Sequence, residues 1–347
     1  MGVDVPRRRS GFVPVLLWSA VALATCWADG ASAQETTSGY LAVQRAFLRE
    51  EFDTASALAQ TFLADHADAS EAPRVQIWLA LSLDRLQRTH EALQQFDLLK
   101  SRLRRDNPLW SEVLFWEGDV SRRASQMVRA KLVYERLLAS APASSWAPQA
   151  QVGLGLVHLH QQAPELAVTH FHAVATQHAE APIALEARLY EGLCHLQLAN
   201  YEAAFAILES LPRQLEKPDA AAQAAFYLGE SLTGLGRYDE AIETYRMAVA
   251  APPGTPWSYL GLFGVGWAEY RAGRCPESVE AFRQYLGQAV ADHRSAALFA
   301  QGSCLMQMGH EPEALGRFAQ VLTSEADRPL AFESGLVLAD AARRREE

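Results

Sequence analysis

The stretch Phe226 to Val249 reads FYLGESLTGLGRYDEAIETYRMAV and has the pattern of two short helices joined by a tight turn. Before the turn at Gly236, apolar residues recur at near-helical spacing, at Phe226, Leu228, Leu232 and Leu235. After the turn, a second apolar face follows, at Ala241, Ile242, Tyr245, Ala248 and Val249. Asp239 and Glu240 open this second run, where the helix dipole favours negative charge. The stretch therefore predicts a helical hairpin.

The same pattern recurs along the chain about every 37 residues. A small residue marks the first helix of each copy: Ala80, Gly118, Gly155, Gly192, Gly229, Gly266 and Gly302. Twelve positions later stands a second small residue: Ala92, Ala130, Ala167, Ala204, Ala241, Ser278 and Ala314. Four positions further stands a large apolar one: Phe96, Tyr134, Phe171, Leu208, Tyr245, Phe282 and Phe318. Small side chains let two helices approach closely, and a single hairpin cannot bury both faces, so the pattern predicts stacked hairpins.

This pattern resembles the tetratricopeptide repeat (TPR) family, in which L-G-x2-Y ends the first helix and A-x3-F-x2-A forms the second. Leu228, Gly229, Ala241, Tyr245 and Ala248 match that pattern in order. The resemblance implies an all-α fold, a right-handed α-α superhelix of about eight hairpins with a C-terminal capping helix. The period is longer than the usual one, as in bacterial cell-envelope TPR proteins such as outer-membrane assembly lipoproteins and Tol–Pal-associated periplasmic proteins.

The solenoid is expected over residues 34–347. Its hairpins are predicted near 38–70, 72–106, 109–142, 147–180, 181–216, 219–252, 256–290 and 294–326, and the capping helix at 329–345. A terminal helix with a polar outer face is what a repeat stack needs at its end.

The first 33 residues have a different character. Three arginines at 7–9 precede an apolar stretch from Val13 to Trp27, and Ala31-Ser32-Ala33 stands before Gln34. This order is typical of a secretory signal peptide that is cleaved between Ala33 and Gln34. We therefore expect the protein to be exported to the periplasm.

Two alternatives for this segment stay open. A lipoprotein signal would end at Cys26 and anchor the chain to the outer membrane, although Thr25 before it is unusual for lipidation. An uncleaved anchor is the other alternative, because the apolar run is not far from membrane-spanning length. We expect contact with a membrane only through such an N-terminal anchor.

Composition and motifs exclude several classes of function. The net charge of −10 at pH 7 argues against general nucleic-acid binding. No nucleophile motif, phosphate loop or Cys-x-x-Cys pair occurs. The glycine-rich stretch from Gly261 to Gly266 lies in a predicted helix with no strand before it, so it indicates close helix packing rather than a nucleotide site. We predict no catalytic activity and no cofactor.

Three cysteines lie beyond the predicted signal peptide: Cys194, Cys275 and Cys304. Antiparallel stacking places the end of one hairpin's first helix beside the start of the preceding second helix. Cys304 and Cys275 occupy those two places, so we predict a disulfide between them in an oxidising compartment. The alternative is two unpaired, buried thiols that act as small apolar residues. Cys194 is predicted to be buried and unpaired.

Six of the ten histidines fall between His158 and His195. The pairs His158/His160 and His170/His172 are two residues apart, so their members point to different sides of a helix. We therefore predict ordinary packing and surface histidines rather than a metal site.

The family resemblance also implies where a partner binds. In TPR arrays the first helices line a concave groove, and certain positions after the repeat's small residue face into it. Carried onto this chain, they include four leucines for an apolar floor, Leu156, Leu159, Leu193 and Leu196. They also include Trp267, Tyr270 and Arg271, which have the composition of a binding hot spot, and the basic residues Arg122 and Arg123. The alternative is that the leucines and the aromatic pair serve internal packing.

These observations predict a non-catalytic scaffold or adaptor in the bacterial cell envelope. Its partner is expected to be a protein or peptide, bound as a helix or extended segment in the groove. The alternative is a structural, lipid-anchored subunit of an outer-membrane assembly or secretion complex. An enzyme or solute-binding protein would need a pocket with convergent polar groups, which the sequence does not indicate.

Overall fold

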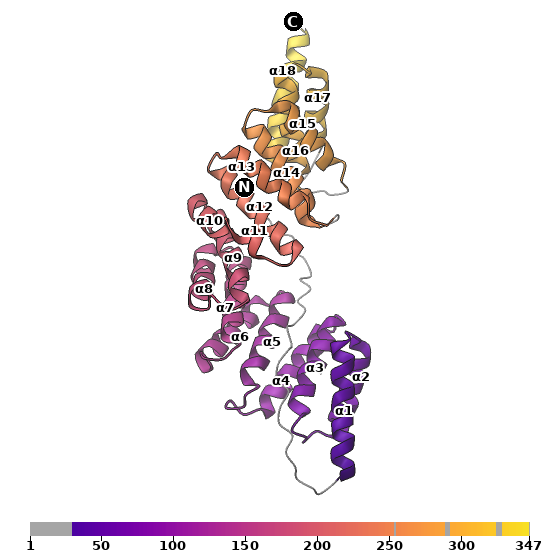
Figure 1. Cartoon of the computed structure of the whole chain (residues 1–347). Coiled ribbons are helices and arrows are strands. Elements are labelled where there is room, and N and C mark those ends of the chain that lie inside the picture. The colour runs from indigo at the N-terminus through magenta and orange to yellow at the C-terminus, as the bar shows by residue number, and fades with distance from the viewer. Residues whose placement is uncertain (1–29, 253–254, 289–291, 324–327, 347) are drawn as a thin grey trace. The chain divides into compact units, whose positions relative to one another are not determined.

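The computed structural model describes residues 30–252, 255–288, 292–323 and 328–346, in which every regular element is an α-helix (Figure 1). The predicted all-α class is confirmed. The described residues form two compact units, 30–174 and 175–346. In a repeat stack each hairpin contacts only its neighbours, so the sequence period looks the same on both sides of such a boundary.

The first unit is a row of antiparallel hairpins. Its helices are α1 (Gly30–Leu48), α2 (Phe52–Asp65), α3 (Ala72–Arg85), α4 (Thr89–Arg102), α5 (Trp110–Arg123), α6 (Met127–Ser140), α7 (Ala147–His160) and α8 (Pro164–Gln177). Helix α8 continues past the boundary between the units. From α1 to α7, each helix contacts the next along the chain, and each first helix contacts the first helix of the following hairpin.

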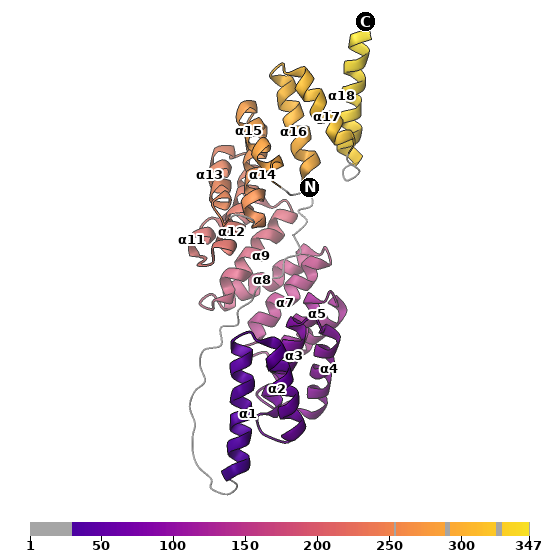
Figure 2. The same ribbon diagram turned by 90° about the vertical axis from the view of Figure 1, so that its right-hand side faces the viewer.

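The second unit repeats this arrangement. Its helices are α9 (Ile183–Gln197), α10 (Tyr201–Leu208), α11 (Leu211–Gln214), α12 (Pro218–Gly234), α13 (Tyr238–Val249), α14 (Pro256–Arg271), α15 (Cys275–Leu286), α16 (Arg294–Gln307), α17 (Glu311–Leu322) and α18 (Arg328–Glu346). Helix α14 contacts α12 on one side and α16 on the other. Figure 2 shows α16, α17 and α18 side by side at the C-terminal end, where α18 packs on both of the others.

The periodic small and large residues meet where the two helices of a hairpin cross. A Cβ atom built on Gly229 would lie 2.5 Å from the ring of Tyr245, and one built on Gly118 would lie 2.5 Å from the ring of Tyr134. Real side chains do not approach so closely, so these positions accept only glycine unless the ring moves. The small and large residues of the repeat therefore pack against each other, as the sequence pattern predicts.

Every turn between the helices of a hairpin contains one residue with positive φ. These residues are Glu50, Gln87, Ser125, Gln162, Ala199, Gly236, Gly273 and Gly309. In the sixth hairpin, the Arg237 N–H donates to the Leu232 carbonyl at 2.9 Å, and the Gly236 N–H donates to the Thr233 carbonyl at 3.1 Å. This is the Schellman arrangement, which satisfies the last carbonyls of a helix. A left-handed residue therefore ends each first helix, whether or not it is glycine.

The fifth hairpin departs from the predicted pair of helices. Its second helix breaks after Leu208 and resumes as the short α11. Pro212 explains the break, because its ring would clash with the carbonyl four residues earlier and it has no N–H to donate. The guanidinium of Arg188 covers the break, since it donates to the Ile207 carbonyl at 3.2 Å and to Gln214 Oε1 at 3.0 Å.

The predicted signal peptide lies mostly outside the described residues, together with Cys26. Helix α1 begins at Gly30, so Ala33 and Gln34, the residues of the predicted cleavage site, lie in its first turns. Among the helices of the described residues, none combines the length and apolar character needed to cross a membrane.

Candidate partner-binding surface

Four aromatic side chains follow one face of α14: Tyr259, Phe263, Trp267 and Tyr270. Their spacing of four, four and three residues places them on one side of a helix. The rings of Phe263 and Trp267 stack with their centroids 6.1 Å apart, and those of Trp267 and Tyr270 are 5.5 Å apart. All four side chains are half-buried. We call this row the α14 aromatic stripe.

Phe263 anchors the stripe to the core. Its ring centroid lies 5.4 Å from that of Tyr285 and 5.9 Å from that of Phe282, and both partners are almost fully buried. The imidazole of His293 stacks on it at 4.9 Å. The sequence prediction singled out Trp267 but missed Phe263, although a second aromatic residue one turn earlier was the available signal. The stripe is therefore a supported, preorganised surface.

The predicted hot-spot residues lie together at the end of this stripe. Trp267 and Tyr270 are half-buried, and Arg271 beside them is exposed. On the neighbouring helix α16, the half-buried side chains of Phe299 and Met306 pack with Tyr270 against one core cluster. The apolar face of α14 thus continues onto α16.

Glu230 lies on the helix that contacts α14 from the other side. The hydroxyl of Tyr245 donates to Glu230 Oε1 at 2.5 Å and lies 3.2 Å from the hydroxyl of Thr233. Burial raises the pKa of Glu230, and burial together with this carboxylate raises the pKa of Tyr245 well above its ordinary value. Glu230 was not among the predicted site residues.

The basic residues predicted as a partner contact are engaged within the first unit. Arg122 pairs with Asp119 at 2.7 Å, and Arg123 pairs with Asp119 at 3.0 Å and with Asp84 of the preceding hairpin. Burial alone would raise the pKa of Asp119, but the two arginines outweigh it and hold that pKa below its ordinary value. The charge of both arginines is therefore balanced by acids on a neighbouring turn and a neighbouring helix.

The four predicted floor leucines are divided between the two units. Leu156 and Leu159 lie half-buried on α7 in the first unit. In the second unit, Leu193 on α9 is only 1% exposed, so it packs inside, while Leu196 is half-buried. For Leu193 the alternative of internal packing is therefore the one that the structure supports.

The first unit carries a second aromatic group that the sequence prediction missed. The rings of Phe115 and Trp146 stack at 4.9 Å, and Trp116 meets Trp146 edge-on at 5.7 Å. All three side chains are half-buried. The group joins α5 to the start of α7, and Trp146 belongs to the hairpin after that of Phe115 and Trp116, which is why no local pattern revealed it.

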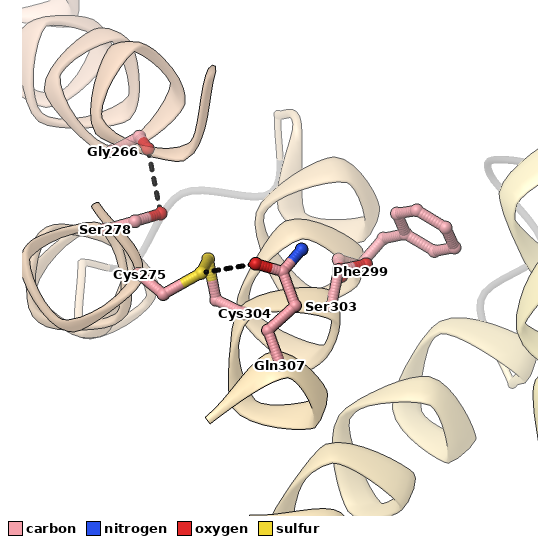
Figure 3. Close-up of a disulfide and its surroundings, with 7 residues drawn as sticks. All are labelled: Gly266, Cys275, Ser278, Phe299, Ser303, Cys304 and Gln307. Carbon is pink, nitrogen blue, oxygen red and sulfur yellow. Dashed lines mark hydrogen bonds between the residues drawn. A yellow bond between two sulfur atoms is a disulfide. The ribbon is translucent and has the colours of Figure 1, made fainter. Parts of the chain in front are cut away.

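A disulfide supports the far end of the α14 aromatic stripe (Figure 3). It joins Cys275, the first residue of α15, to Cys304 of α16, and their Cα atoms are 4.9 Å apart. Gln307 Oε1 lies 3.3 Å from Cys275 Sγ. Tyr270 packs against the cluster that contains both cysteines. Cys194, on α9, is buried outside this disulfide.

Two histidines of the histidine-rich segment pack against each other. The rings of His158 and His170 stack face to face at 5.3 Å with an angle of 2°. Burial, with a contribution from His158, lowers the pKa of His170 to about 4, so His170 is neutral near pH 7. Stacked rings present faces rather than nitrogen lone pairs to each other. Within the part of the chain that the structure describes, no group of three or more His, Cys, Asp or Glu side chains could hold a metal ion.

Comparison with known proteins identifies the repeat. The tetratricopeptide repeat family model matches residues 152–217, 208–256 and 263–322. Among solved structures, the fold is similar to that of a tetratricopeptide repeat protein from Parabacteroides merdae, with 15% identity, a TM-score of 0.55 and coverage of 76% of this chain and 98% of that one. No curated protein matches the sequence.

Two further similar structures are complexes. One is a Rap protein complexed with Competence and Sporulation Factor, at 15% identity and a TM-score of 0.50, covering 90% of this chain and 98% of that one. The other is a chain of the APC/C hetero-tetramer Cut9–Hcn1, at 14% identity and a TM-score of 0.52, covering 88% of this chain and 57% of that one. At these identities the likeness establishes the fold.

Proposed function

Because the chain belongs to the tetratricopeptide repeat family, we propose that it is a non-catalytic scaffold whose second unit binds a partner segment on the α14 aromatic stripe. Tetratricopeptide repeats are protein-interaction scaffolds, and two structures of similar fold are complexes. Fold alone does not decide the site, so the proposal rests on the residues of the stripe.

The observation that carries the proposal is the half-burial of Trp267 and Tyr270 on a supported helix face. Tryptophan, tyrosine and arginine dominate the energetics of protein interfaces, and Arg271 stands beside the two rings. Phe263 holds Trp267 by stacking, so little side-chain freedom is left to lose on binding. A helix or an extended peptide is the kind of segment that such a face accepts.

We also propose that the protein acts in the bacterial cell envelope. The arginines at 7–9, the apolar stretch that follows and the Ala31-Ser32-Ala33 sequence support export. Mass spectrometry of the protein from its native cells tests this directly. An N-terminus at Gln34 is the expected result. A lipid-modified Cys26 would instead favour the structural, membrane-anchored subunit, and an intact Met1 in the cytosolic fraction would contradict export.

Photo-crosslinking in cells tests the partner site. A photoreactive residue at position 271 is exposed next to the stripe, and one at position 277 on α15 serves as the matched exposed control. We expect one dominant adduct from position 271 that is lost in Trp267→Ala/Tyr270→Ala and absent from position 277. Equal adducts from both positions, or an adduct that survives the double substitution with the fold intact, would contradict the proposal.

A further inference from the structure

Two hairpins carry a carboxylate directly after the repeat's small residue, and the two carboxylates have different partners. After Gly118 stands Asp119, which Arg122 and Arg123 neutralise from the following turn. After Gly229 stands Glu230, and the two equivalent positions of its helix hold Thr233 and Gly234. The repeat thus places an acid at the same point twice, and arginines from the following turn of the helix pair with Asp119.

No cation among the described residues pairs with Glu230. Within the residues that the structure describes, neither Glu230 nor Arg271 forms an ion pair, and the one hydrogen bond to the Glu230 carboxylate comes from the neutral hydroxyl of Tyr245. Elsewhere in this unit, the buried carboxylate of Glu269 pairs with Arg274. A half-buried carboxylate without a cation carries a desolvation cost that a basic ligand would remove.

The location of Glu230 connects it to the α14 aromatic stripe. The Tyr245 ring lies between Gly229 of α12 and Gly264 of α14, since a Cβ atom on either glycine would lie 2.5 Å from it. The hydroxyl of this ring reaches Glu230, so the carboxylate lies at the seam between the two helices. Trp267 is three residues, or just under one turn, beyond Gly264 on α14. A carboxylate and an aromatic ring are therefore presented by adjacent first helices.

We propose that Glu230 and Trp267 form a subsite for a lysine or arginine side chain of the bound partner segment, an inference that rests on the proposed function. The carboxylate accepts charge-assisted hydrogen bonds from the cation, and the indole face attracts it through the ring quadrupole. The neighbouring apolar side chains of the stripe accept the aliphatic part of the same residue. The partner segment therefore carries a basic residue next to apolar ones.

Peptide pools test this subsite on the purified full chain. Four pools of nine-residue peptides have the central position fixed as Arg, Lys, Gln or Glu and the other positions randomised. Each pool is passed over immobilised wild type, Glu230→Gln, Trp267→Ala, or Glu277→Gln, which removes the same charge from an exposed position of α15. The amide oxygen of Glu230→Gln can still accept the hydrogen bond from Tyr245, so the fold is kept, as circular dichroism would verify.

We expect the wild type to retain the Arg and Lys pools about tenfold more than the Gln pool, the factor that one charge-assisted contact of about 1.4 kcal/mol provides. Glu230→Gln is expected to abolish that preference and Glu277→Gln to keep it. Equal retention of the Arg and Gln pools, with retention still dependent on Trp267, would overturn this inference alone. Retention of no pool above the Trp267→Ala level would overturn the proposed binding surface as well.

Discussion

Tyr245 of α13 packs against Gly264 of α14, the first helix of the next hairpin. A Cβ atom on Gly264 would lie 2.5 Å from the ring carbon Cδ1 of Tyr245, which leaves no room for a side chain. The same ring covers Gly229 in its own hairpin. One tyrosine thus holds two successive hairpins at a fixed distance, and the α14 aromatic stripe is positioned by that contact.

Replacing Gly264 with alanine should therefore be destabilising. We expect Gly264→Ala to lower the free energy of unfolding by about 1–3 kcal/mol, because overpacking forces the Tyr245 ring or the helix to move. Urea unfolding followed by circular dichroism measures this. Gly316 on α17 is the matched control, since no atom lies within 4 Å of a Cβ built there. Gly316→Ala should gain about 0.5–1 kcal/mol from helix propensity. Equal effects of the two substitutions would refute the close contact.

Substitutions at two of the left-handed turn residues should change the stability of the protein in opposite directions. Ala199 adopts a φ of 55° and Gly236 a φ of 75° at equivalent turns. A side chain in this conformation costs roughly 1 kcal/mol, which glycine avoids. Ala199→Gly should therefore stabilise the protein by about that amount and Gly236→Ala should destabilise it by a similar amount. Thermal melting of both variants checks the signs, and two shifts in the same direction would contradict this account of the turns.

The disulfide predicts a redox-dependent stability of the second unit. Cys275 and Cys304 are separated by 29 residues, and closing such a loop contributes about 3–4 kcal/mol on the chain-entropy model. Reduction of the wild type should lower its unfolding midpoint, and Cys275→Ser/Cys304→Ser should show the same midpoint with and without reductant. Non-reducing peptide mapping should recover the two cysteines in one linked peptide. An unfolding midpoint of the wild type that does not change on reduction would contradict this prediction.

The stability that Asp119 contributes should depend on pH in the opposite way to the stability that Glu230 contributes. The folded pKa of Asp119 lies below its ordinary 3.8, because its arginines outweigh the effect of burial, so its stabilisation is present above pH 3.8 and is lost below it. The folded pKa of Glu230 lies above its ordinary 4.5 because of burial, so its contribution is present below pH 4.5 and is lost as pH rises through the folded pKa.

Neutral substitutions separate these two contributions. At pH 7, Asp119→Asn should be less stable than the wild type by about 2 kcal/mol, and Glu230→Gln should be more stable. Both differences should shrink towards pH 3, where the two carboxyl groups take up protons. Thermal melting across this range is the measurement. A Glu230→Gln protein that is less stable than the wild type at pH 7 would mean that an internal cation serves this carboxylate.

Repeat spacing predicted the hairpins because packing between neighbours depends on local positions. A glycine followed sixteen residues later by a large side chain, as at Gly229 and Tyr245, lets the two helices of one hairpin approach closely. The pairing of Cys275 with Cys304 was accessible for the same reason, since it joins successive hairpins. The repeat pattern predicts one second helix in the fifth hairpin, and the break after Leu208 differs from it because Pro212 cannot continue a helix.

The spacing of small and large residues by itself determined the all-α class, the hairpin unit and the positions of close helix contact. The tertiary structure alone decided which polar side chains have internal partners. Arg123 is neutralised by Asp84 from another hairpin, whereas among the described residues Glu230 accepts a hydrogen bond from the Tyr245 hydroxyl of its own hairpin. Charge compensation depends on which side chains converge in space from different helices, and a position within one repeat does not contain that information.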